Sequence, residues 1–308
     1  MTTQQDMAKI LRGNPRRRRR EAIVRTLFLL AAALSVVVSV AIVLSVLIDA
    51  VEFLRSIDLN QLWADGWFPR RGRFSIPTIF VGSLMITLVA LVVALPLGLG
   101  AAIYLSEYAR PGVRRTLKPT LEILAGVPSV VLGFFALSFI TPNIMQAIWQ
   151  DTQVFNYGAA GIAVGILIIP LVASVAEDAM RAVPQSLREA SYGLGAKRWH
   201  TSLRVIFPAA LSGIVAAVIL GFARALGETM VVAIAAGASG GALLNVDITQ
   251  GGTTMTAAMA SLAIGSDQVA GDSSAFQSLF FVGLLLFLMT LGLNVLSERL
   301  VRRFRQKY

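Results

Sequence analysis

The chain has 308 residues, of which 56% are hydrophobic and only 14% charged, and its mean hydropathy of +0.73 excludes an ordinary soluble globular domain. The formal net charge of +10 does not indicate nucleic-acid binding, because the charged residues stand at the ends of apolar runs rather than on one face of a domain. Since the chain has no cysteine, disulfides and thiolate metal sites are also excluded.

Six apolar runs follow one another along the chain, and each is long enough to cross a hydrocarbon core, which takes roughly 20 helical residues. The runs expected to span the membrane are 23–51, 76–104, 121–140, 158–176, 211–236 and 276–296. Strands with open edges would leave backbone groups unsatisfied in lipid, so the runs predict helices. The expected fold class is an all-α integral membrane protein with six transmembrane helices, in which residues 76–300 form the main transmembrane domain.

The positions of lysine and arginine predict which segments face the cytoplasm. Of the 27 lysines and arginines, 22 fall in the basic tail 1–22 with the adjoining Arg25, in the loops 107–120 and 178–208, and in the C-terminal region 298–308. Only four fall in the expected outer loop 52–75, and a second outer loop is expected over 238–275. Both termini, including the basic tail 301–308, are therefore expected in the cytoplasm of a bacterium, with the chain a multi-pass protein of its inner (plasma) membrane.

The arginine-rich start could be mistaken for the basic region of a signal peptide. The apolar run that follows is too long for such a peptide, and no small-x-small cleavage site ends it, so we interpret it as an uncleaved first helix. The run Arg16–Arg20 is interpreted as a topology anchor on anionic lipid rather than a nucleic-acid patch.

A polar segment at 181–208 separates the fourth and fifth apolar runs and has the features of a short helix. Pro184 suits a helix start, and Glu189 lies near the N-terminal end, where the helix dipole favours a negative charge. Ala190 and Gly195 lack bulk, which suits insertion into a groove of another protein. On these features alone, a docking helix and an amphipathic helix lying on the membrane surface fit equally well.

A second constellation lies inside the fifth run, where Arg224 and Glu228 are followed by Thr229. A charge near the bilayer centre costs at least about 2.5–3.5 kcal/mol, so such residues usually mark a pathway. Arg224 and Glu228 are four positions apart and share a helix face. The guanidinium offers planar donors for a phosphate-like oxyanion, with Glu228 as its counter-ion between substrates. The alternative is a buried ion pair that only holds helices together.

No catalytic signature is found in the chain. A phosphate-binding P-loop is absent from the sequence, so ATP, if it is used, is expected on another subunit. The single histidine, His200, is interpreted as a surface or docking residue, because it has no partner set for metal binding or proton transfer. We therefore expect no enzymatic activity, no metal and no cofactor on this chain.

The polar segment resembles the EAA loop of ABC importer permeases. The resemblance rests on Glu189-Ala190-Ser191, on Gly195 four positions later, and on the ending Val205-Ile206-Phe207-Pro208 in register. Ser191 replaces the second alanine of the pattern, and since serine is small, docking should survive. In that family the loop forms a cytoplasmic coupling helix that docks into the ATPase subunit. The resemblance therefore implies coupling roles for Glu189, Ala190, Ser191, Gly195 and Pro208.

A narrower resemblance rests on three further runs of sequence. These runs are Gly221–Met230 (GFARALGETM), Ala125–Phe135 (AGVPSVVLGFF) and Thr254–Ala257 (TMTA). They look like the Pst-type phosphate importer permeases, in particular the PstC-like member of the PstA/PstC pair, and the similarity runs from about Phe80 to Leu300. The resemblance implies a type I ABC importer (MetI-like) permease fold and roles in phosphate passage for Arg224 and Glu228. It also implies three partners: a PstA-like permease subunit, a cytoplasmic ABC ATPase dimer that binds ATP, and an extracytoplasmic phosphate-binding protein.

Three alternatives are weighed against a phosphate importer permease. A permease for another oxyanion or small solute shares every feature except the narrower resemblance. A stand-alone secondary transporter or a channel predicts internal repeats or ionisable residues spread over several helices, whereas here the deep charges lie in one helix. A membrane enzyme lacks a nucleophile–base pair or a metal set.

Overall fold

The structure is a computed structural model, which describes residues 15–238, 240, 244–265 and 273–304. The expected cytoplasmic tails 1–22 and 301–308 lie partly outside the described residues. Two compact units make up the chain, one running to Asp49 and the other starting at Ala50.

The described part of the first unit belongs to a single long helix. Helix α2 runs Pro15–Ser56, and its last turns belong to the second unit. Within it, Arg19–Ser56 is a candidate membrane span with a mean hydropathy of 2.9 and no buried residue in its most apolar window. Large apolar side chains such as Phe28 and Val36 are exposed all along it. Such a surface is stable in lipid and not in water.

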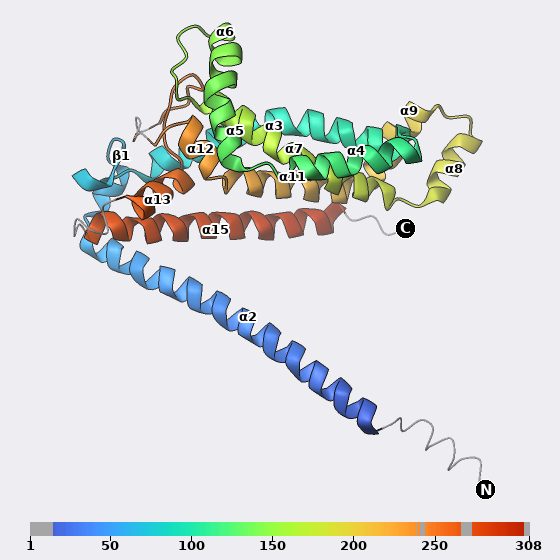
Figure 1. The fold of residues 1–308 in the computed structure, drawn as a ribbon, viewed down its shortest axis with the longest axis horizontal. Coiled ribbons are helices and arrows are strands. Elements are labelled where there is room, and N and C mark those ends of the chain that lie inside the picture. The colour runs from blue at the N-terminus through green and yellow to red at the C-terminus, as the bar shows by residue number, and fades with distance from the viewer. Residues whose placement is uncertain (1–14, 239, 241–243, 266–272, 305–308) are drawn as a thin grey trace. The chain divides into compact units, whose positions relative to one another are not determined.

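The second unit is a helical bundle with one short hairpin (Figure 1). Its long helices are α3 (Ile76–Ile103), α7 (Tyr157–Arg181), α11 (Leu211–Leu226) and α15 (Ser273–Phe304). The shorter elements are η1 (Leu59–Trp63), β1 (Trp67–Phe68), η2 (Pro69–Arg71), β2 (Arg73–Phe74), η3 (Tyr104–Tyr108), α4 (Pro111–Leu124), α5 (Ser129–Phe135), η4 (Ala136–Met145), α6 (Gln146–Ile148), α8 (Gln185–Gly193), α9 (Arg198–Thr201), η5 (Ser202–Ile206), α10 (Phe207–Ala209), α12 (Met230–Ala235) and α13 (Met255–Ile264). Strands β1 and β2 pair antiparallel, with Trp67 opposite Phe74.

The centre of the bundle is the contact between α3 and α7, and α7 also packs against α11, which in turn packs against α15. Glycines on α7 allow the close approach to α3. A Cβ atom at Gly161 would lie 2.5 Å from the Cβ of Val89, and one at Gly165 would lie 2.9 Å from the carbonyl oxygen of Ala90. Small residues at such contacts are what drives helix association in lipid, where a hydrophobic force between helices is missing.

The third span begins later than the sequence predicts. Residues 121–124 end the separate helix α4, the chain turns over 125–128, and the candidate span is Ser129–Ile148. The reason is Pro128, which has no N–H and disfavours helical conformation in the residue before it. The apolar residues at the end of α4 extend the hydrophobic run without belonging to the same helix.

The fifth span is interrupted, where the sequence predicts one continuous helix over 211–236. Helix α11 ends at Leu226, and α12 begins only at Met230. At its other end α11 meets the helical stretch Arg198–Ala209 at an angle of 73°, and this bent pair is the sixth candidate span. The second, fourth and sixth apolar runs lie in the spans Ile76–Tyr108, Tyr157–Arg181 and Ser274–Arg299, which extend beyond the runs.

The two expected outer loops contain more buried structure than their polar composition suggests. Trp67 is buried, with its ring centroid 6.2 Å from that of Phe74. Trp63 remains exposed. In the second loop, α13 is a short apolar helix that packs against α15, α3 and α12. Strand β1 and helix α13 lie at one end of the bundle, and helices α8 and α9, which belong to the polar segment 181–208, lie at the other end (Figure 1).

Candidate functional site

An ion pair lies where the fifth span is interrupted. Near the C-terminal end of α11, the Nη1 of Arg224 donates to the Oε2 of Glu228 at 2.8 Å. Glu228 sits in the break between α11 and α12 and its side chain is 4% exposed, whereas the side chain of Arg224 is 49% exposed. The sequence predicted this pairing from the spacing of four, and the structure brings the two residues together.

The break in the fifth span is held by helix α13. The hydroxyl of Thr256 donates to the carbonyl oxygen of Glu228 at 2.8 Å, and Thr254 caps the start of α13 by accepting from the N–H of Ala257. The Oγ of Ser83 on α3 accepts from the N–H of Met255 at 2.9 Å. Hydroxyl groups thus supply partners to backbone groups at an interrupted helix and at a helix start, as membrane interiors require.

The geometry suits reversible binding of an anion. Among the described residues, Glu228 is the single partner of the Arg224 guanidinium, which has five N–H donors in a planar fork. Thr229 lies beside the pair, and its hydroxyl donates to the carbonyl oxygen of Gly227 at 3.3 Å on an exposed surface. A half-exposed guanidinium tethered by one buried carboxylate can therefore offer its remaining donors to a ligand.

A pocket of about 280 Å³ lies between α12 and α13, and neither Arg224 nor Glu228 lines it. Its lining is Met230, Ala233, Ala238, Ala257, Ala260, Ser261, Ile264 and Gly265. Because this lining is apolar apart from one hydroxyl, the pocket is not a binding site for an oxyanion. The candidate anion contact is the exposed side of Arg224 itself.

The polar segment 181–208, called the coupling segment from here on, contains a helix followed by a tight turn. Helix α8 starts at Gln185, with Pro184 as the residue that caps it, and it ends at Gly193. Gly195 has a φ of +79°, and its N–H donates to the carbonyl oxygen of Tyr192 at 2.9 Å. A glycine is favoured here because the chain adopts a left-handed conformation after the helix, a reason that the interpretation by lack of bulk did not include.

The residues assigned to coupling divide into exposed and buried ones. Glu189, Ala190, Gly195 and Pro208 are exposed, together with the apolar side chains of Leu194 and Trp199. Ser191 is buried, and its hydroxyl lies 2.8 Å from that of Thr201 on α9. Ser191 thus joins two parts of the coupling segment rather than facing outward. His200, next to Trp199, makes an edge contact with the indole ring at 5.6 Å between ring centroids.

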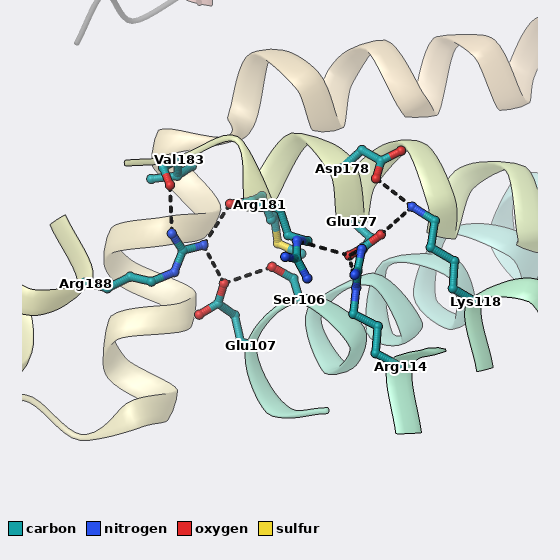
Figure 2. Close-up of polar contacts among 10 residues, drawn as sticks. Ser106, Glu107, Arg114, Lys118, Glu177, Asp178, Arg181, Val183 and Arg188 are labelled. Atoms are coloured by element: carbon teal, nitrogen blue, oxygen red, sulfur yellow. Dashed lines mark hydrogen bonds and ion pairs between the residues drawn. The ribbon is translucent and has the colours of Figure 1, made fainter. Parts of the chain in front are cut away.

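The coupling segment is tied to the ends of membrane helices by charged side chains (Figure 2). Arg188 on α8 pairs with Glu107 in the π-helical turn η3, with 2.9 Å between Nη2 and Oε1. The side chains of Arg188 and Glu107 are only 12% and 3% exposed. Ser106 also donates to the same carboxylate oxygen.

A second charged cluster joins α4 to α7 (Figure 2). Its centre is Glu177, whose side chain is fully buried and accepts from Arg114 and Lys118, each at 2.8 Å. Lys118 also reaches Asp178 at 2.6 Å. Burial lowers the pKa of Lys118, but its hydrogen bonds to Asp178 and Glu177 outweigh that effect and raise the pKa above the ordinary value for lysine. The cluster fixes α4 against the membrane bundle.

Sequence reasoning missed Glu107 and Glu177 as structural centres. Both acids stand at the end of an apolar run, and an ionisable residue at such a depth is a signal in itself. The expected fourth span, 158–176, stops one residue short of Glu177, so that acid was not counted within the helix. The pairing of each acid with a distant base could not be derived from spacing along the chain.

Comparison with known proteins assigns the chain to a family of membrane transport components. Residues 94–308 match the family model described as the binding-protein-dependent transport system inner membrane component, and the chain belongs to this family. It is therefore a multi-pass membrane protein, as the number of apolar helices independently indicates.

Two named bacterial permease proteins are similar to this chain. The phosphate transport system permease protein PstC of Pasteurella multocida is 30% identical over 287 residues, which cover 87% of each chain. The probable ABC transporter permease protein YqgH of Bacillus subtilis is 39% identical over 190 residues, or 62% of this chain and 59% of that protein.

Among solved structures, the methionine ABC transporter MetNI in an inward-facing conformation has a similar fold. The TM-score is 0.52 at 20% identity, over 73% of this chain and 92% of the other. This likeness shows the fold alone. The expected all-α fold class, with a MetI-like permease architecture, is confirmed.

Proposed function

We propose that this chain is the permease subunit of an ATP-driven importer and that it forms, with a related PstA-like subunit, the path for inorganic phosphate. The observation that carries the proposal is the half-exposed Arg224 guanidinium, held by the buried Glu228 at a break in a membrane helix. The similarity to phosphate transport permeases over most of the chain supports the same substrate.

In this proposal Arg224 replaces part of the water that a phosphate ion loses on entering the membrane. Its planar donors match the oxygens of phosphate, and Glu228 neutralises the guanidinium when no anion is bound. Thr229, on the exposed side of the break, adds a hydroxyl within the same path. Anion and carboxylate compete for one guanidinium, which keeps binding weak enough for release.

The proposed orientation places both termini and the coupling segment in the cytoplasm, following the charge count. The exposed Glu189, Ala190, Gly195 and Pro208 then face a cytoplasmic ABC ATPase dimer, which binds ATP and performs the hydrolysis. The hairpin end of the bundle faces an extracytoplasmic phosphate-binding protein. No cofactor or metal is assigned to this chain, and its role is non-catalytic.

The test is uptake of labelled phosphate by a bacterium lacking this gene, complemented with wild type or with Arg224→Gln. We expect wild type to restore ATP-dependent uptake that arsenate, but not sulfate, suppresses. Arg224→Gln should lower the rate by about one to two decades, the effect of losing one charge-assisted hydrogen bond at the barrier. If wild type restored uptake of a different oxyanion and not of phosphate, the proposed substrate would be wrong, and the assignment as an ATP-driven importer would stand.

A further inference from the structure

Two arginines of the coupling segment hold the same turn at the end of α3. Arg188, on α8, pairs with the carboxylate of Glu107 at 2.9 Å. Arg198, on α9, donates to the backbone carbonyl oxygen of Glu107, and its guanidinium lies 5.1 Å from the ring centroid of Tyr108. Both helices of the segment therefore contact the same short π-helical turn, η3, through an arginine side chain.

Arg188 also binds the end of a second membrane helix. Its Nη1 donates to the carbonyl oxygen of Val183 at 2.7 Å, and its Nη2 donates to that of Met180 at 2.9 Å. The last carbonyl groups of a helix have no partner within the helix, and a cation there is favoured by the helix dipole. One guanidinium thus connects α8, the C-terminal end of α7 and the end of α3.

The stretch of chain that links α7 to α8 is short and not helical. Only residues 182–184 separate α7 from α8, and the turn 194–197 separates α8 from α9. A movement of α8 could be taken up by rotation about these few backbone bonds without moving α3 or α7. The buried contacts of Arg188 remove that freedom, because charge-assisted hydrogen bonds with little exposure are strong and directional.

We propose that Arg188 is a positioning residue that, with Glu107, makes the coupling helix α8 move as one body with the ends of α3 and α7. It transmits movement of the ATPase to the membrane helices and does not itself touch the ATPase, because its side chain points into the fold (Figure 2). The transmission role rests on the proposed importer function, whereas the mechanical connection does not depend on the substrate.

The first test measures the connection itself, with the full-length protein in detergent. Amide hydrogen exchange over 185–193 and 104–108 should become about tenfold faster in Arg188→Gln and in Glu107→Gln, since each change removes a charge-assisted contact. Arg181→Gln is the matched control, because that side chain is 48% exposed and lies 3.8 Å from its carboxylate partner. Exchange in Arg188→Gln at the rate of wild type would overturn the proposal.

The second test measures transmission, in proteoliposomes containing the assembled transporter with inorganic phosphate as the probe. We expect Arg188→Gln to lower the phosphate moved per ATP hydrolysed by about tenfold, while Arg181→Gln keeps the wild-type ratio. A residue that only stabilised the fold would lower uptake and hydrolysis together and leave the ratio unchanged, and that result would refute transmission. Absence of phosphate uptake by wild type would overturn the proposed substrate, while the exchange experiment still decides the connection.

Discussion

The hydroxyl groups of Ser191 and Thr201 lie 2.8 Å apart in the interior of the coupling segment, and they join the end of α8 to α9. Between them the chain reverses through the turn 194–197, where Gly195 has a φ of +79°. Leu194, the first residue of this turn, is exposed. The shape of the proposed docking surface therefore depends on one left-handed residue and one buried hydroxyl pair.

Replacement of this glycine tests that dependence. Gly195→Ala should destabilise the turn by about 1–2 kcal/mol, because a side chain disfavours the left-handed conformation. A Cβ atom would meet no other atom within 4 Å at either Gly195 or Gly193, so Gly193→Ala is the matched control without the backbone strain. The measurement is co-purification with the ATPase and uptake at matched abundance. Equal behaviour of the two variants would mean that the left-handed turn is dispensable.

A double variant can distinguish a transport role of the Arg224–Glu228 ion pair from a purely structural role. If Arg224 binds the anion, the double variant Arg224→Gln with Glu228→Gln should remain impaired in phosphate uptake by about one to two decades. A neutral hydrogen-bonded pair can replace a buried ion pair at little cost in stability. Uptake near the wild-type rate, measured at matched membrane abundance, would therefore show that the pair only holds the helices.

The buried Glu177 should matter more for stability than its exposed neighbour. Glu177→Gln removes the charge that Arg114 and Lys118 bind, and we expect a loss of about 3 kcal/mol, since breaking a buried pair leaves charges without a partner. Asp178→Asn is the control, because Asp178 is 63% exposed and its pair with Lys118 should contribute less than about 1 kcal/mol. Thermal unfolding in detergent compares the two, and equal midpoints would contradict the central role of Glu177.

The proposed orientation can be tested with single cysteines in this cysteine-free chain. Cysteines replacing the exposed Gly112 and Ser186 should be protected from a membrane-impermeant reagent in intact cells. Cysteines replacing the exposed Asn60 and Asp151 should react. Permeabilised cells, in which all four should react, provide the control. Labelling of Ser186→Cys in intact cells would reverse the topology.

Composition and spacing predicted the features that depend on neighbours in sequence. The pair Arg224–Glu228 follows from a spacing of four on a helix, and the apolar runs follow from the thickness of the bilayer. The start of the third span was placed too early from composition, because the apolar end of the amphipathic α4 and the apolar start of a span have the same composition. Only the backbone restriction at Pro128 distinguishes them.

Contacts between segments that are distant in the sequence could not be predicted from it. Thr256 bonds to Glu228 across 28 positions, and Arg188 to Glu107 across 81. Each contact requires the whole bundle to be in place, so no local pattern specifies it. The positive φ of Gly195 is different, since a glycine two residues after a helix is a recognisable signal that was interpreted in terms of size.

Helix α13 also determines how membrane crossings should be counted. Ten helical residues rise about 15 Å, half of a hydrocarbon core of about 30 Å. This apolar helix is therefore too short to cross the hydrocarbon core by itself. A hydropathy count that included α13 as a crossing would therefore add a span that this helix is too short to make.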